Sequence, residues 1–162
     1  MKDLLDKLTS YNIFNYLFPG VVFTVILSKV TPYNLLQQDF IVGAFLYYFI
    51  GLVISRIGSL LIEPFLKYIN FLKFSDYPDF VKASKVDEKI DTFSEVNNMY
   101  RTITSMFLTL VLIKGFVALS KYWLFLKNWE ITILTLFLLT LFLFSYRKQT
   151  SYITKRIEAN LK

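Results

Sequence analysis

Three ionisable side chains lie inside apolar stretches of this 162-residue chain, and their type and place could support chemistry. Arg56 and Glu63 are seven residues apart in the second apolar stretch, and Lys114 lies in the third. Charged groups at membrane depth are costly and often mark ion paths or protein contacts. The alternative is structural, because Arg56 and Lys114 could extend toward the membrane surface while Glu63 lies among headgroups.

A run of carboxylates at Asp87, Glu88, Asp91 and Glu95 resembles a metal-binding or acid–base cluster. Lysines alternate with these residues, however, which is typical of the solvated face of a helix. The chain has no cysteine and no histidine, and this excludes thiol nucleophiles, Ser/His/Asp catalysis and nearly every zinc site. We therefore expect no enzyme activity, no metal and no cofactor.

The elements that carry these residues are predicted to be membrane helices. The chain is 55% hydrophobic and has a mean hydropathy of +0.48, which is too apolar for an ordinary soluble domain. It has only 5 glycines and 4 prolines, so few residues interrupt long helices. Since about 20 apolar residues cross a bilayer, we predict an all-α, polytopic membrane protein with four transmembrane helices and helical cytoplasmic extensions.

The predicted segments follow in chain order. They are an amphipathic amino-terminal arm at 1–10, spans at 11–30 and 40–62, a cytoplasmic helical segment at 67–101, spans at 102–123 and 129–146, and a basic cytoplasmic tail at 147–162.

Lysine and arginine residues are distributed unevenly between the two sides of these spans. Thirteen lie in the two terminal segments and the 67–101 segment, and three lie in the other two loops. Cytoplasmic loops carry the excess of basic residues, so both termini are predicted to be cytoplasmic. Trp123 and Trp129 flank the short outer loop, where an aromatic belt would place them.

Prolines are expected to shape the first two spans. Pro19 lies near the middle of the first span and predicts a kink, because proline removes one backbone hydrogen bond. The pair Glu63-Pro64 is expected to end the second span.

Small residues at Gly51, Ser55 and Ser59 follow each other at four-residue steps on the second span. This spacing allows helix backbones to approach closely. It predicts helix packing, either within one chain or between copies.

The two cytoplasmic extensions each carry an apolar stripe at three- and four-residue steps, typical of amphipathic helices. From Asp79 to Lys114 there is no proline or glycine, so one helix could run into the third span. Exposed apolar stripes indicate a protein contact. The predicted contact residues are Val86, Ile90, Phe93, Ile153, Ile157 and Leu161.

The stretch YNIFNYLFPGVVF, residues 11–23, is similar to the opening span of small bacterial membrane proteins from anti-phage defence loci. With its four-helix plan and short extensions, the whole chain resembles the membrane subunit of the Kiwa defence system. That resemblance implies a homo-oligomer of the inner membrane that senses phage attack and works with a cytoplasmic DNA-binding partner. It supplies no catalytic residues.

Two function classes follow from these features. The first is a non-enzymatic membrane sensor or scaffold that forms a homo-oligomer and recruits a cytoplasmic effector. The second is a pore in which Lys114, Arg56 and the kinked first helix line a path that favours anions. The expected partners are the lipid bilayer, further copies of the chain and a cytoplasmic protein. We expect no direct nucleic acid binding, since juxtamembrane basic residues are attracted to anionic lipid.

Overall fold

The computed structural model describes residues 10–161, which are helical almost throughout and contain no strand. Helical stretches long and apolar enough to cross a membrane are Ile13–Val30, Phe40–Tyr68, Lys89–Ser120 and Glu130–Leu161. The predicted all-α fold class with four candidate spans is therefore confirmed. The predicted amphipathic arm lies outside the described residues, apart from its last residue.

The first helical stretch contains a π-helical turn directly before its proline. It consists of α2 (Ser10–Asn12), the π-helix η1 (Ile13–Leu17) and α3 (Phe18–Val30). The N–H of Phe18 donates to the carbonyl of Ile13, five residues back. Pro19 then occupies the first turn of α3, where its missing N–H costs least. The helix therefore continues past Pro19, because the π-helical turn changes the hydrogen-bond register before it.

The second helical stretch also has a π-helical turn before its proline, and it extends further than predicted. It consists of α4 (Phe40–Ile57), η2 (Gly58–Ile62) and α5 (Glu63–Tyr68). The expected end at Glu63-Pro64 is wrong, because the helix continues to Tyr68. The N–H of Glu63 donates to the carbonyl of Gly58, and the π-helical turn places Pro64 in the first turn of α5.

The remaining helices are α6 (Tyr77–Val86), α7 (Lys89–Ser120), α8 (Leu124–Asn128) and α9 (Glu130–Leu161). An unbroken helix from Asp79 was expected, but the chain is extended at Asp87. The Asp87 carboxylate accepts a hydrogen bond from the backbone N–H of Lys89 at 3.0 Å, an interaction that competes with helix continuation. From Lys89 onward α7 runs without interruption into the third candidate span.

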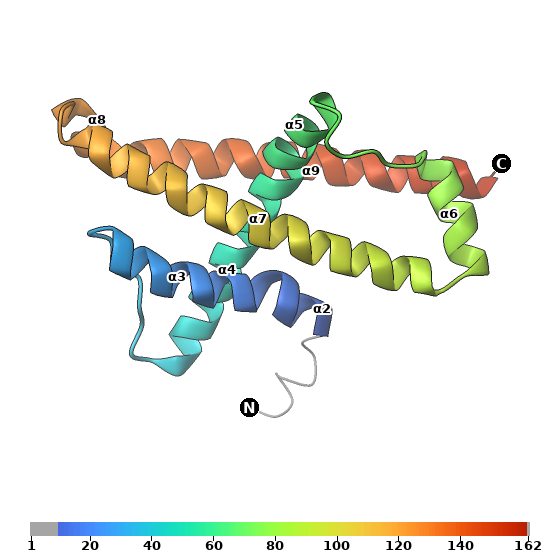
Figure 1. Cartoon of the computed structure of the whole chain (residues 1–162), viewed down its shortest axis with the longest axis horizontal. Helices are drawn as coiled ribbons and strands as arrows, with labels where there is room; N and C mark the ends of the chain where they lie inside the picture. Colours follow the sequence, from blue (N-terminus) through green and yellow to red (C-terminus); the bar gives the residue numbers. More distant parts are fainter. Residues whose placement is uncertain (1–9, 162) are drawn as a thin grey trace.

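The two longest helices, α7 and α9, are joined by α8 and run antiparallel to each other (Figure 1). The second stretch crosses between them, and both α4 and η2 contact α7 and α9. At the far end α6 bridges the two long helices (Figure 1). The rings of Tyr77 on α6 and Tyr152 on α9 lie 5.9 Å apart.

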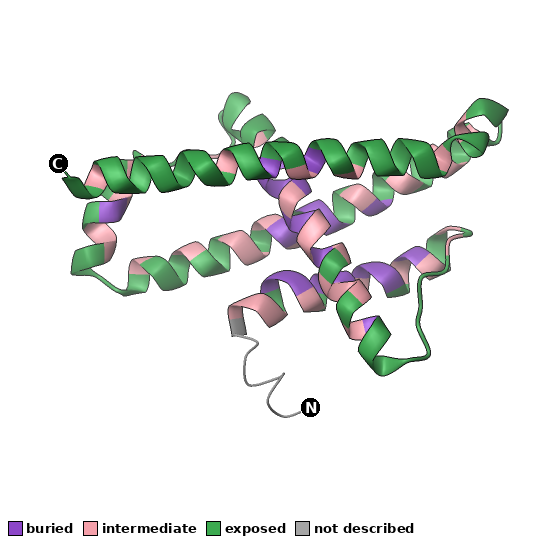
Figure 2. Ribbon diagram, turned by 180° about the vertical axis from the view of Figure 1, so that it is seen from behind, coloured by how far each residue is buried: buried purple, intermediate pink, exposed green. Residues whose placement is uncertain are grey.

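Buried side chains concentrate where the helices cross (Figure 2). Phe23, Leu27, Ile54, Met106 and Leu110 form the main core between α3, α4 and α7. The outer surface of α9 stays exposed, with only Leu141 and Ser145 classed as buried on that helix. Exposed apolar surface on spanning helices is expected where lipid replaces water.

Contacts at the two ends of the bundle establish the relative direction of the spans. Asn15, near the start of the first span, contacts Thr102 on α7. At the other end, the Tyr33 hydroxyl donates to the Glu130 carboxylate at 2.9 Å. Partial burial and this carboxylate raise the pKa of Tyr33 above its ordinary value. The first and third spans therefore run in the same direction, and the fourth runs against them (Figure 1).

Candidate functional site

Polar side chains from all four candidate spans meet where the second stretch crosses α7 and α9. By the bounds predicted from the sequence, the first and third spans begin near these residues, and the second and fourth end near them. We call this cluster the polar junction, and its members are Asn15, Arg56, Ser59, Glu63, Arg101, Thr102 and Lys148.

The carboxylate of Glu63 is the acidic centre of the polar junction. Its residue is only 7% exposed, and Oε2 accepts a hydrogen bond from Arg101 Nη1 at 2.8 Å. Oε1 accepts one from Lys67 Nζ at 3.0 Å, one helical turn further on. A buried carboxylate is tolerated where charged donors satisfy both oxygens, as here. Glu63 thereby joins the second span to α7.

Lys148 joins the second span to α9 through a carbonyl that the π-helix leaves free. Its Nζ donates to the backbone oxygen of Ser59 at 2.6 Å and to Ser59 Oγ at 2.8 Å. In an α-helix the Ser59 carbonyl would accept from Glu63, but that N–H donates to Gly58 instead. The next residue, Pro64, has no N–H. The local register thus creates the acceptor that Lys148 uses.

Asn15 and Thr102 join the first span to α7. The Thr102 hydroxyl lies 2.8 Å from Asn15 Oδ1 and 2.9 Å from the carbonyl of Asn98, so it can donate to either. The Asn15 amide donates to the Tyr11 hydroxyl at 3.2 Å. Asn15 and Thr102 are at most 1% exposed, so their polar groups depend on each other for hydrogen bonds.

We expect Thr102→Val to destabilise the folded protein by about 1 kcal/mol, because it leaves the buried Asn15 side chain with one unpaired acceptor. A double-mutant cycle with Asn15→Leu should recover part of that loss. Reversible unfolding in mixed micelles, followed by circular dichroism, measures both. Thr104→Val is the matched control because Thr104 is exposed on the same helix. Equal effects at positions 102 and 104 would contradict the assignment.

Positive charge is in excess at the polar junction. Lys148 lies within electrostatic range of Arg56, Lys67 and Arg101, and the Glu63 carboxylate also acts on it. Arg56 Nε is buried and has no hydrogen-bond partner in the part of the chain described. Residues 10–161 contain no group of three acidic, His or Cys side chains that could hold a metal. The polar junction can therefore attract an anion. Its hydrogen bonds and ion pair also join the four candidate spans to one another.

The chain matches no family model, no curated protein and no solved structure. The structure places the predicted site residues as follows. Arg56 and Glu63 come together in the polar junction. Lys114 is exposed on α7, and it makes no hydrogen bond or ion pair within the described residues.

The predicted packing residues Gly51, Ser55 and Ser59 are all buried inside the single chain. A methyl group added at Gly51 would overlap the backbone of Tyr16, so α4 and η1 are in backbone contact there. This stripe consequently offers no open surface to a second copy.

The predicted protein-contact residues remain largely exposed. The break at Asp87 separates Val86 on α6, which is 90% exposed, from Phe93 on α7, which is 66% exposed. On α9, Ile153 and Ile157 are each 54% exposed and Leu161 is 82% exposed, whereas Ile90 on α7 is partly covered.

Sequence reasoning missed several members of the polar junction. Arg101 and Lys148 were interpreted only as charges at the ends of spans, and Asn15 and Thr102 were not distinguished from other polar residues. An available signal was their common depth, since each lies within a turn or so of a predicted span boundary.

Proposed function

We propose that this protein is a non-enzymatic sensor or scaffold subunit of the bacterial inner membrane that self-associates and recruits a cytoplasmic effector. The carrying observation is that α7 and α9 extend past the polar junction with apolar side chains left exposed, Phe93, Ile153 and Leu161 among them. The basic residues at this end favour a cytoplasmic location.

The extensions are long enough to reach beyond the headgroups. From Arg101 back to Lys89, α7 continues for about 18 Å, and from Lys148 to Leu161, α9 continues for about 20 Å, at about 1.5 Å per residue. Since α6 contacts both helices, the two extensions form one connected platform. Apolar side chains on such a platform would face water unless another protein covers them.

The polar junction gives this platform a physical link to the bilayer. It lies at the base of both extensions, where Glu63 holds α7 through Arg101 and Ser59 holds α9 through Lys148. A shift of the second span would therefore act on both extensions at once. We propose this coupling as the sensing step, because a packed junction passes from one arrangement to another rather than deforming continuously.

The effector is proposed to be a cytoplasmic DNA-binding protein of an anti-phage defence complex, as the resemblance of residues 11–23 to the Kiwa membrane subunit implies. The chain itself is proposed to contact protein and lipid, with both termini in the cytoplasm. Its basic tail is assigned to anionic lipid of the inner leaflet.

We expect the double variant Ile90→Asp with Phe93→Asp to abolish capture of the effector, because two carboxylates on the apolar stripe would be desolvated in the complex. Co-purification from cells that express the chain with its neighbouring genes measures this. The matched pair is Phe93→Asp against Thr92→Asp, which adds the same charge at an adjacent exposed position. Unchanged oligomer and effector capture by the double variant would remove the basis of the proposal.

A further inference from the structure

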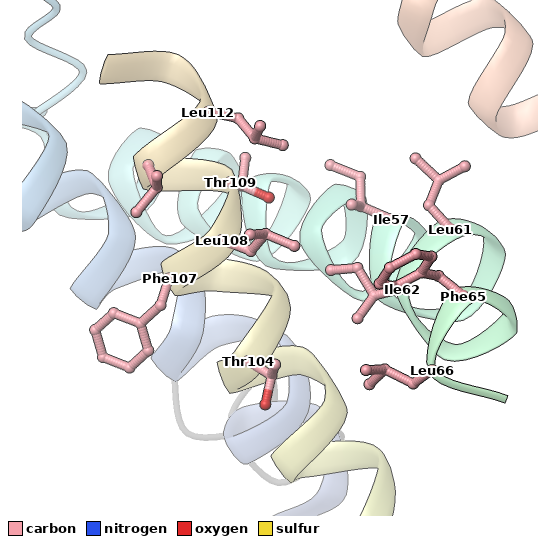
Figure 3. A pocket seen from close by; sticks show the side chains of 11 residues that line it. Ile57, Leu61, Ile62, Phe65, Leu66, Thr104, Phe107, Leu108, Thr109 and Leu112 are labelled. Atoms are coloured by element: carbon pink, nitrogen blue, oxygen red, sulfur yellow. The ribbon is translucent and has the colours of Figure 1, made fainter. Parts of the chain in front are cut away.

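An apolar groove of about 630 Å³ lies between the second span and α7 (Figure 3). This volume is within the range of about 300 to 1,000 Å³ that small-molecule sites occupy. Ile57, Leu61 and Phe65 line one wall, and Thr104, Leu108 and Leu112 are among the residues of the other. Both walls belong to candidate membrane spans.

The ion-paired residues of the polar junction are close in sequence to residues that line this groove. Arg101 precedes Thr104 by three residues, so both lie on the same face of α7. Glu63, which pairs with Arg101 at 2.8 Å, lies between the lining residues Ile62 and Phe65 in sequence. The lining thus begins within one helical turn of Arg101 on α7 and next to Lys67 on α5.

The charged end has donors left over. The Lys67 side chain is 43% exposed. Its ammonium group has three N–H donors, and one of them donates a hydrogen bond to Glu63. The nearby Arg56 and Lys148 add two further positive charges. Arg101, Lys67 and Lys148 therefore all act on the Glu63 carboxylate, and Arg56 acts on Lys148. This excess of positive charge favours a ligand that brings negative charge.

We propose that the groove binds one anionic phospholipid, with its phosphate at Lys67 and Arg101 and one acyl chain along the wall formed by Leu61 and Leu108. The charge at one end and the apolar lining at the other match the two parts of such a lipid. A zwitterionic lipid fits less well because its own ammonium group meets the excess of cations. This site is separate from the exposed stripes assigned to the effector.

Native mass spectrometry of the full chain in mild detergent tests the proposal, with phosphatidylglycerol and phosphatidylcholine of identical acyl chains as probes. We expect one phosphatidylglycerol to be retained per chain, and phosphatidylcholine to be retained about tenfold less. Lys67→Gln should lower phosphatidylglycerol retention about fivefold. Leu108→Trp should lower retention of both lipids, because the indole fills the groove.

Lys114→Gln is the matched control for charge, since Lys114 is exposed on α7 and does not line the groove. Its lipid retention should equal that of the unchanged chain. Equal retention of the two lipids by the unchanged chain would overturn the proposal, as would retention that neither Lys67→Gln nor Leu108→Trp alters.

A second copy of the chain is the competing occupant of the groove. Because the chain has no cysteine, Leu108→Cys introduces a single thiol. Efficient disulfide dimers through position 108 in a bilayer would show that another copy covers the groove, and the lipid proposal would then be wrong. Absence of disulfide-linked dimers under oxidising conditions, together with phosphatidylglycerol retention, supports it.

Discussion

Glu63→Gln is expected to destabilise the folded protein by about 3 kcal/mol, the cost of removing one partner from a buried ion pair. The carboxylate is 9% exposed and satisfies Arg101 and Lys67 together. Without it, four cations would remain close together with no negative group between them. Reversible unfolding in mixed micelles measures the change, and added salt should restore part of the stability by screening the cations.

Asp91→Asn is the matched control for this prediction. It removes one negative charge from α7, where Asp91 is exposed and forms no ion pair within residues 10–161. Its effect should stay within about 0.5 kcal/mol, as for most surface substitutions. A Glu63→Gln protein as stable as Asp91→Asn would show that the polar junction does not hold the spans together.

The sequence was sufficient to predict the fold class because the physical signal is long-range and additive. Each span needs only enough apolar residues in a row. The 40–62 prediction falls inside an observed helix, and the 129–146 prediction does so except for Trp129, which precedes α9. Helix ends were harder. The helix continues past Pro64 because of a π-helical turn, and no simple periodicity announces such a turn.

The polar junction could be predicted only in part. Arg56 and Glu63 were recognised as charges at membrane depth, since such charges are unusual in a single span. The partners of Glu63 and Ser59 come from α7 and α9, 38 and 89 residues away, and pairing at that distance depends on the tertiary fold. Lys148 also uses a carbonyl that becomes available only through the π-helical register of η2.

For the exposed stripes, the sequence predicts the apolar spacing but not the break in the helix at Asp87. Val86 was grouped with Ile90 and Phe93 on one helix because their spacing is helical. The Asp87 side chain bonds to the backbone of Lys89 instead and separates α6 from α7. An Asp within a charged stretch is compatible both with the surface of a helix and with a local turn, so the sequence alone does not distinguish them.

Gly51→Ala is expected to cost about 3 kcal/mol, the upper part of the range for overpacking a fitted contact. The added methyl group would overlap the Tyr16 carbonyl, which is backbone and cannot rotate away. A methyl group at Gly20 would likewise overlap the backbone carbonyl of Tyr47. Each of the first two spans therefore places a glycine against the backbone of the other. Forcing these spans apart would also loosen the hydrogen bond between Asn15 and Thr102, because Asn15 directly precedes Tyr16. Reversible unfolding in mixed micelles again measures the loss.

Gly115→Ala separates this steric effect from the general effect of replacing a helical glycine. Gly115 lies on α7 and has no atoms within 4 Å of an added methyl group. Alanine there should leave stability unchanged or raise it by up to about 1 kcal/mol, because alanine is the better helix former. Opposite signs for the two substitutions would establish that the α4–η1 crossing depends on backbone contact. If Gly51→Ala behaved like Gly115→Ala, the two spans would have to lie further apart than the structure places them.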